Sequence, residues 1–401
     1  MFWAFILLTL LVSVAGSACG SEGPSGEADN KIVFVAPFNG AWRLLIVNAD
    51  GRGKPTVAPV PKDWPVDDAT WSPDGSKIAY NDFDNLSVVN ADGSSHVQLY
   101  YDANSYTPFT WSGNSDQIAF VRNDPRHEFA TLAIFVVRAD GAGRRMLVDG
   151  DSPSWSPDGR TIALLRCPFV RVINSDGTGE RKLVRFDGSG NCADEGLEIL
   201  WSRDSGKIAY TTSHWKNPKR SCESSGSCGY IDPDTNIDLC RLHIIRVNES
   251  SNVQVVGGGL LGKFGSQCDI SWSPDGKEVA FTRNGFLYSV TADRRRERQF
   301  VRGLEPSWSP DGNHIAFLRN GTIYVLDAQR HETRRLARAD ELSWSPDGKA
   351  LVIARAIKPR GPNNHHGEYV IETMDADGGH VRRIWPRVGT CDCGEPAWQT
   401  R

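Results

Sequence analysis

The hydrophobic positions of this chain repeat as one unit: a tryptophan, a polar turn and a short apolar run. The phrase Trp-Ser-Pro-Asp-Gly is complete five times and precedes runs such as Ile78-Ala79-Tyr80. Pro, Asp and Gly in this order favour a type I turn with a bulge, which joins two antiparallel strands. The repeat residues are Trp71, Asp74, Gly75, Trp155, Asp158, Gly159, Trp272, Asp275, Gly276, Trp308, Asp311, Gly312, Trp344, Asp347 and Gly348, and degraded copies begin at Trp111 and Trp201.

A second turn signal follows the apolar runs. Asp-Gly pairs at 50–51, 92–93 and 140–141 stand between apolar segments and short strand-like segments. Asp-Gly between two such segments is a hairpin signal. One unit is therefore four antiparallel strands, which we name a, b, c and d in chain order. The tryptophans recur at intervals of 36 to 71 residues, and four strands per repeat of this length are typical of a β-propeller blade.

The two ends of the chain complement each other. Residues 31–36, 43–48 and 56–58 have the pattern of strands b, c and d, whereas Glu395–Trp398 has the pattern of a strand a alone. Pairing the C-terminal strand, with Trp398, to the N-terminal blade would close the ring and remove exposed sheet edges. We therefore predict an all-β fold over residues 31–401: an eight-bladed β-propeller of four-stranded antiparallel blades.

The phrase Trp-Ser-Pro-Asp-Gly followed by Ile-Ala-Phe resembles the TolB-like, WD-repeat-like propeller repeat. That repeat occurs in TolB proteins and in the propellers of prolyl-oligopeptidase-type peptidases, and here it covers nearly all of 31–401. The resemblance implies a fold, because the motif residues build blades rather than sites. We find neither a TolB-type α/β domain before the first strand nor a Gly-x-Ser-x-Gly motif, so we expect neither the Tol–Pal role nor a hydrolase domain.

The N-terminal residues predict export. Phe2–Val14 is an uninterrupted apolar run followed by small residues, and Cys19 comes directly after them. This resembles a bacterial lipoprotein signal, which implies lipidation of Cys19; plain secretion with Cys19 free and a retained anchor are the alternatives. We expect a signal peptide at 1–18, a flexible tether at 19–30, and a lipoprotein or a periplasmic or extracellular protein that meets the membrane only through its lipid.

Charge argues against nucleic acid as a partner. The net charge is −4 and the pI is near 6.2, so the chain lacks a basic footprint. The run Arg294-Arg295-Arg296 falls at an expected c–d turn, where it is a solvated tip. We expect a monomer without a nucleic-acid partner.

The long connections gather on one side of the expected propeller. In a four-stranded blade the a–b and c–d turns share one face, the turn face, and the b–c and d–a connections share the other, the loop face. Loops on a rigid scaffold usually carry binding, although drift in loop length is the alternative. The long connections at 122–131, 187–198, 213–236, 257–267, 357–367 and 386–394 all belong to the loop face.

The cysteines indicate a loop face that is cross-linked by disulfides, which we call disulfide-stapled. Eight of them follow Cys19, and all fall on the loop face in this strand assignment. An even number in an exported chain favours disulfides. Proximity in sequence favours the pairs Cys222–Cys228, Cys167–Cys192 and Cys240–Cys268, with Cys391–Cys393 as a fourth.

Two stretches of the chain could hold a metal ion, and each has an alternative interpretation. Cys391 and Cys393 with His365-His366 offer a zinc set, against which export favours oxidation. A polar stretch also resembles the opening of a calcium loop, although Ile237 stands where that loop has Gly and His243 where it has Glu. The alternative is a polar turn in which the Asp side chains cap their own backbone. We expect no cofactor, with calcium as the weaker alternative at Asp232, Asp234, Asn236 and Asp238.

The function is predicted from the loop face and from the acidic and histidine residues of the blades. We expect no His, Asp or Glu set that recurs at matching blade positions, and therefore no enzyme. The main prediction is a non-catalytic, extracytoplasmic binding scaffold that presents a disulfide-stapled loop face to a protein or glycan partner at the cell envelope. The alternative is a propeller enzyme, a lyase or lactonase-type hydrolase, with its site at the mouth of the central channel.

Overall fold

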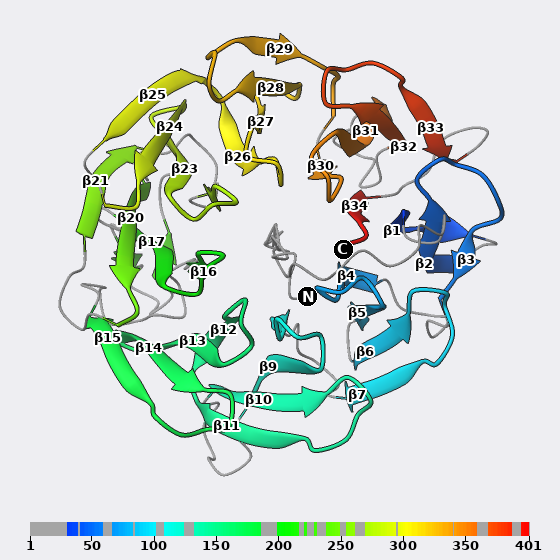
Figure 1. Cartoon of the computed structure of the whole chain (residues 1–401). Helices are drawn as coiled ribbons and strands as arrows, with labels where there is room; N and C mark the ends of the chain where they lie inside the picture. Colours follow the sequence, from blue (N-terminus) through cyan, green and yellow to red (C-terminus); the bar gives the residue numbers. More distant parts are fainter. Residues whose placement is uncertain are drawn as a thin grey trace.

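Blades of four antiparallel strands form a ring (Figure 1). The computed structural model describes residues 30–38, 41–58, 66–82, 85–101, 108–123, 132–185, 199–215, 220–222, 228–230, 238–248, 254–260, 269–293, 296–339, 341–358, 368–386 and 394–400. Over these ranges eight four-stranded sheets are present, which confirms the predicted all-β, eight-bladed propeller. Strand a of each blade lies toward the centre of the ring and strand d toward its outside, as β12 and β15 of one blade illustrate (Figure 1).

The strand bounds follow the predicted units closely. The closing blade contains β34 (Gly394–Trp398), β1 (Lys31–Phe38), β2 (Ala41–Asn48) and β3 (Thr56–Val57). The next three blades contain β4 (Val66–Trp71), β5 (Lys77–Asp82), β6 (Asn85–Asn90), β7 (Val97–Tyr101); β8 (Phe109–Trp111), β9 (Gln117–Asn123), β10 (Leu132–Arg138), β11 (Arg145–Asp149); and β12 (Asp151–Trp155), β13 (Thr161–Arg166), β14 (Phe169–Asn174), β15 (Arg181–Arg185).

The other half of the ring has the same order. Its blades contain β16 (Ile199–Trp201), β17 (Lys207–Trp215), β20 (Asp238–Arg246), β21 (Gln254–Leu260); β22 (Ile270–Trp272), β23 (Glu278–Arg283), β24 (Phe286–Thr291), β25 (Glu297–Arg302); β26 (Leu304–Trp308), β27 (His314–Leu318), β28 (Ile323–Asp327), β29 (Thr333–Arg335); and β30 (Glu341–Trp344), β31 (Ala350–Lys358), β32 (Glu368–Asp375), β33 (Arg382–Trp385). A hairpin of β18 (Arg220–Cys222) and β19 (Cys228–Tyr230) lies between β17 and β20 in the chain.

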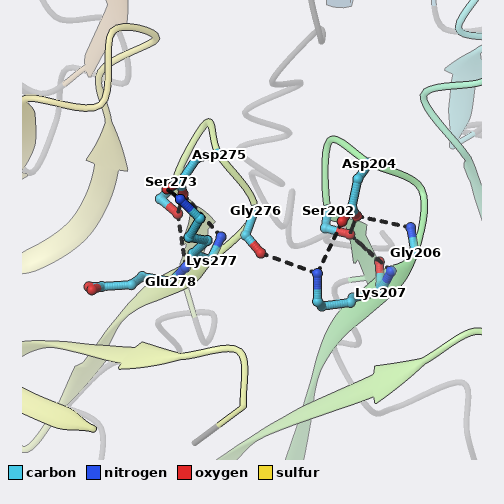
Figure 2. Close-up of polar contacts among 9 residues, drawn as sticks. All are labelled: Ser202, Asp204, Gly206, Lys207, Ser273, Asp275, Gly276, Lys277 and Glu278. Atoms are coloured by element: carbon cyan, nitrogen blue, oxygen red, sulfur yellow. Dashed lines mark hydrogen bonds and ion pairs between the residues drawn. The ribbon is translucent and has the colours of Figure 1, made fainter.

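Each a–b turn is held by a repeated hydrogen-bond pattern. In the β16–β17 turn, Ser202 Oγ donates to Asp204 Oδ1 (2.6 Å), and the amide of Lys207 donates to Ser202 Oγ (2.9 Å). Ser273 and Asp275 repeat the first bond at 2.7 Å in the neighbouring blade (Figure 2). The two turns adjoin, since Lys207 Nζ donates to the carbonyl of Gly276 at 3.5 Å. The motif therefore links blades as well as closing hairpins.

The predicted left-handed position in the turn is confirmed. Gly75 has φ 68° and Gly276 has φ 66°. In the degraded copies, Ser115 (φ 62°) and Ser205 (φ 56°) take the same place. Glycine adopts this conformation without the steric penalty that a side chain brings, so the complete copies close the turn with less strain.

The tryptophans join neighbouring blades. Trp272 Nε1 donates to the carbonyl of Leu200 (3.1 Å), the residue before the tryptophan of the previous blade. Corresponding bonds run from Trp71 to Ala397, Trp111 to Thr70, Trp201 to Ser154 and Trp344 to Ser307. The apolar core lies between blades: one cluster contains Val33 and Leu44 of the closing blade with Trp71 and Ile78 of the next. Each blade is thus buried by its neighbours.

The predicted closure of the ring is confirmed. Strand β34 pairs antiparallel with β1, with Ile32 opposite Trp398. The amide of Gln399 donates to the carbonyl of Lys31 (2.8 Å), and Gln399 Nε2 donates to the carbonyl of Gly75 (2.7 Å). Trp398 is 7% exposed. The last strand is therefore both hydrogen-bonded and packed into the core.

Some residues predicted as loop are strand. Strand β17 continues to Trp215, where it pairs with Asp238, and β21 runs through Gln254–Leu260. Antiparallel pairing with β20 supplies partners for their backbone groups, so the strands lengthen into the expected connections. The predicted signal peptide, Cys19 and most of the tether lie outside the described residues. In the part that the structure describes, no helix has the length and apolarity to cross a membrane.

Candidate functional site

The cysteines and the metal candidates fall mostly outside the described residues. Cys167, in the β13–β14 turn on the loop face, is disulfide-bonded. Cys222 and Cys228 are cross-strand partners in the β18–β19 hairpin, and Cys240 lies in β20, but the four proposed pairings remain predictions. The described side chains include no group of three or more His, Cys, Asp or Glu that could hold a metal ion. Outside the description lie Cys192, Cys268, Cys391, Cys393, Asp232, Asp234 and Asn236, and the side chain of Asp238.

An acidic set does recur at matching blade positions, and our expectation that none would was wrong. Strand a ends at its tryptophan on the turn face, so residues three positions earlier lie toward the loop-face end of the innermost strands. Counting back from each tryptophan reveals the set in the sequence itself. The acids three residues before a tryptophan are Asp68, Glu198, Asp269, Glu305, Glu341 and Glu395, and Asp151 stands four before Trp155. Glu198 lies outside the described residues.

Asp269 and Glu305 are brought together by two neighbouring blades. Asp269 directly precedes β22, Glu305 is the second residue of β26, and these two strands contact each other. Burial is the main cause that raises the pKa of Asp269 from 3.8 to about 7, and the negative charge of Glu305 adds to it. A carboxyl group with a pKa near neutrality can donate and accept a proton at physiological pH. Such values are typical of functional sites.

Glu305 also has an unusual backbone conformation. Its φ is 53°, and the pairing of β26 with β27 shifts register between Leu304 and Ser307. Left-handed φ is uncommon for a residue other than glycine, and outside tight turns such strained residues cluster at functional sites. Strand β12 has a matching bulge, where Ser152 has φ 50° and burial raises the pKa of Asp151. Bulges re-aim side chains beside active sites, here at the loop-face end of strand a.

A layer of arginines lies further from the axis on the same face. Each stands in or directly after strand b, four residues after the first residue of the apolar run; they are Arg122, Arg166, Arg283, Arg319 and Arg355. Arg355 donates two hydrogen bonds to Glu372 (2.7 and 2.6 Å), and Arg166 pairs with Asp149 (3.2 Å). The loop face therefore has acids on the innermost strands and mostly neutralised cations behind them.

The fold is that of a β-propeller, with acidic residues at one end of its innermost strands. No known family model matches the chain. It is similar to dipeptidyl-peptidase 5 of Porphyromonas endodontalis, with 25% identity over 219 residues, 46% of this chain and 30% of that protein. The match thus spans less than a third of the relative's length.

Solved structures share the fold at low identity. The dihydro-heme d1 dehydrogenase NirN has 13% identity and a TM-score of 0.60, over 96% of this chain and 78% of that one. An oligogalacturonate lyase in complex with manganese has 15% identity and a TM-score of 0.50, over 74% and 85%. A eukaryotic initiation factor has 13% identity and a TM-score of 0.55, over 93% and 98%. TolB of Acinetobacter baumannii is also a neighbour, with 16% identity over 83% and 82% and a TM-score of 0.38.

These comparisons correct one prediction. We expected a protein that is not an enzyme, but the curated relative is a peptidase, and the dehydrogenase and the lyase are enzymes as well. The expectation failed because it depended on the absence of a recurring acidic set, and that set is present. The alternative, an enzyme with a site near the axis of the propeller, fits the findings better than a scaffold without catalysis.

Proposed function

We propose that this chain is the propeller of an extracytoplasmic enzyme, a hydrolase or lyase, in which Asp269 and Glu305 perform acid–base chemistry at the loop-face end of the innermost strands. The observation that carries the proposal is this pair: a carboxyl group that titrates near neutrality beside a carboxylate held in a strained bulge. The enzymes among the relatives support the same class.

The two carboxyl groups suit different roles. With a pKa of about 7, about half of the Asp269 side chains carry a proton at neutral pH. Asp269 can therefore protonate a leaving group, while Glu305 can accept a proton from water or from the substrate. A proton donor beside a proton acceptor is a common basis for such division of labour.

The local charge favours one class of substrate. Asp151 and Glu341 stand at the corresponding ends of β12 and β30, so several innermost strands present acids to the same side. The negative electrostatic potential of these acids attracts cationic ligands, admits neutral ones and repels polyanions. A peptide with a free amino group fits this charge, and the peptidase relative supports that choice. The protein or glycan partner expected at the cell envelope would then be the substrate.

Activity measurements on a small substrate panel test the proposal. Dipeptidyl p-nitroanilides with cationic and neutral N-terminal residues and oligogalacturonate are the probes, assayed from pH 4 to 9. We expect Asp269→Asn and Glu305→Gln to lower kcat by about 10²–10⁴, the usual contribution of general acid–base catalysis. Asp116→Asn, an exposed aspartate on the turn face, is the matched control.

The pattern of kinetic loss separates chemistry from binding. If both variants raise KM and leave kcat unchanged, the pair binds substrate and does not catalyse. If neither variant differs from Asp116→Asn while the wild type turns over a probe, this site has no part in the reaction. A pH profile without an inflection near 7 would contradict the assigned role of Asp269.

Export is part of the same proposal. The apolar run before Cys19 supports a signal peptide, with Cys19 as the lipidated residue of a monomeric, membrane-tethered protein. The disulfide at Cys167 supports an oxidising compartment, because disulfides persist mainly outside the cytosol.

A further inference from the structure

Two neighbouring blades on the loop face contain the same aromatic stack. In the β22–β25 blade, the rings of Phe281 and Tyr288 stack with centroids 5.5 Å apart. The guanidinium of Arg283 lies over the Tyr288 ring, 4.0 Å from its centroid. Glu297 on strand β25 forms an ion pair with Arg283, so the positive charge over the stack is neutralised within the blade.

The β26–β29 blade repeats this stack at an offset of 36 residues. The rings of Phe317 and Tyr324 are 5.4 Å apart, and the Arg319 guanidinium is 3.9 Å from the Tyr324 centroid. Both distances agree with the first blade to within about 0.1 Å. The two blades are therefore structural copies at this position, and their charges can be compared residue by residue.

The second copy lacks the carboxylate and has an additional cation. The offset that relates Arg283 to Arg319 places Thr333 where Glu297 stands, and Arg335 where Gln299 stands. The pairing of β28 with β29 puts Arg335 directly opposite Tyr324. Arg166, Arg283 and Arg355 occupy the position in their blades that corresponds to Arg319, and each forms an ion pair with a carboxylate. Within the described residues, Arg319 has no carboxylate within ion-pair distance and lies over the Tyr324 ring instead.

The chemistry of this cluster fits an anion. The hydrogen bond and charge of Arg319, followed by those of Arg335, hold the pKa of Tyr324 below its ordinary value. Arg335 is exposed and Arg319 partly exposed, so both are open to a ligand from solvent. Guanidinium groups bind carboxylate and phosphate oxygens through paired N–H donors. At Arg166, Arg283 and Arg355, the chain supplies the carboxylate itself.

We propose that Arg319 and Arg335, beside Tyr324, form an oxyanion-binding site for a carboxylate or phosphate group. The bound oxyanion takes the place that the Glu297 carboxylate fills in the neighbouring blade. The site lies on the same face and in the same blade as Glu305, toward the outside of the ring. It does not depend on the proposed catalysis, because it is derived from the comparison of two repeats.

Direct binding to the full chain tests the site. Inorganic phosphate and acetate are the probes, titrated calorimetrically at constant ionic strength with chloride. We expect Arg319→Gln and Arg335→Gln each to weaken binding at least about tenfold, the loss of one charge-assisted hydrogen bond. Thr333→Glu rebuilds the neighbouring blade's ion pair and should abolish binding while preserving the melting temperature. Arg296→Gln, an exposed arginine at the β24–β25 turn, is the control and should bind as the wild type does.

A second readout reports on Tyr324 itself. A bound oxyanion offsets the two guanidinium charges, so phosphate should raise the apparent pKa of one tyrosine, measured by absorbance at alkaline pH. Tyr324→Phe should lose that component. The inference is overturned if wild type and Thr333→Glu bind the probes equally, or if the wild type shows no saturable binding. Preference for phosphate over acetate, or the reverse, identifies which oxyanion the site selects.

Discussion

Replacing Asp269 by asparagine should stabilise the protein at alkaline pH, although it removes a proposed catalytic group. The pKa of Asp269 is about 7 in the fold, against 3.8 for an ordinary aspartate. The folded state therefore holds the proton more tightly than the unfolded state does. The free energy of unfolding consequently falls as the pH rises from about 4 to about 7. Above pH 7 the protein bears the full cost of ionising Asp269 in the folded state.

The magnitude follows from the difference between the two pKa values. A shift of about three pKa units at about 1.36 kcal/mol each gives at most about 4 kcal/mol. The asparagine side chain of the variant is neutral at every pH, so the substitution removes this cost at pH 8 and changes little at pH 4. Stability gained at the expense of function is a common trade-off at active sites.

Urea unfolding of wild type and Asp269→Asn at pH 4 and pH 8 measures the effect. We expect a higher midpoint for the variant at pH 8, an unchanged slope, and similar midpoints at pH 4. Asp116→Asn controls for the loss of a surface charge. An equal gain at both pH values, or none at pH 8, would show that burial and Glu305 do not raise the pKa of Asp269.

Three further predictions concern the scaffold and export. Deleting residues 396–401 should lower the melting temperature sharply, because β1 loses part of its partner strand and truncation of a buried tryptophan such as Trp398 alone costs about 3–5 kcal/mol; an unchanged value would argue against closure through the termini. Gly75→Ala should destabilise the protein far more than Gly285→Ala. Both glycines have positive φ, but a Cβ at Gly75 would lie 2.2 Å from the carbonyl oxygen of Thr400, whereas nothing lies within 4 Å of a Cβ at Gly285. Equal losses of melting temperature would mean that the backbone strain of a positive φ, and not the clash, sets the cost. Cys19→Ser should move the protein from the membrane fraction to the soluble fraction. Equal membrane retention of the wild type and the variant would contradict the lipid anchor.

The blades could be predicted because the rules that build their turns are local, and the closure could be predicted because the two terminal patterns complement each other. Pro, Asp and Gly in the repeated phrase specify a turn over five residues, and Gly75 and Gly276 have the predicted conformation. The complementary terminal patterns were sufficient to pair β1 with β34, since a lone strand a leaves unpaired backbone groups on its neighbour. The lengths of β17 and β21 were not predictable, because pairing with β20 rather than local propensity extends them.

The candidate sites required the tertiary structure, even though their residues are visible in the sequence. Asp269 and Glu305 are 36 positions apart, and they influence each other because the innermost strands of adjacent blades contact near the axis. Likewise, the change from Glu297 to Thr333 is evident from the repeat, but Arg335 comes to face Tyr324 through the register of β28 and β29. Turn geometry depends on neighbours in the chain, so sequence alone determined it. Charge coupling depends on distance and burial in space, and only the packed ring of blades decided those.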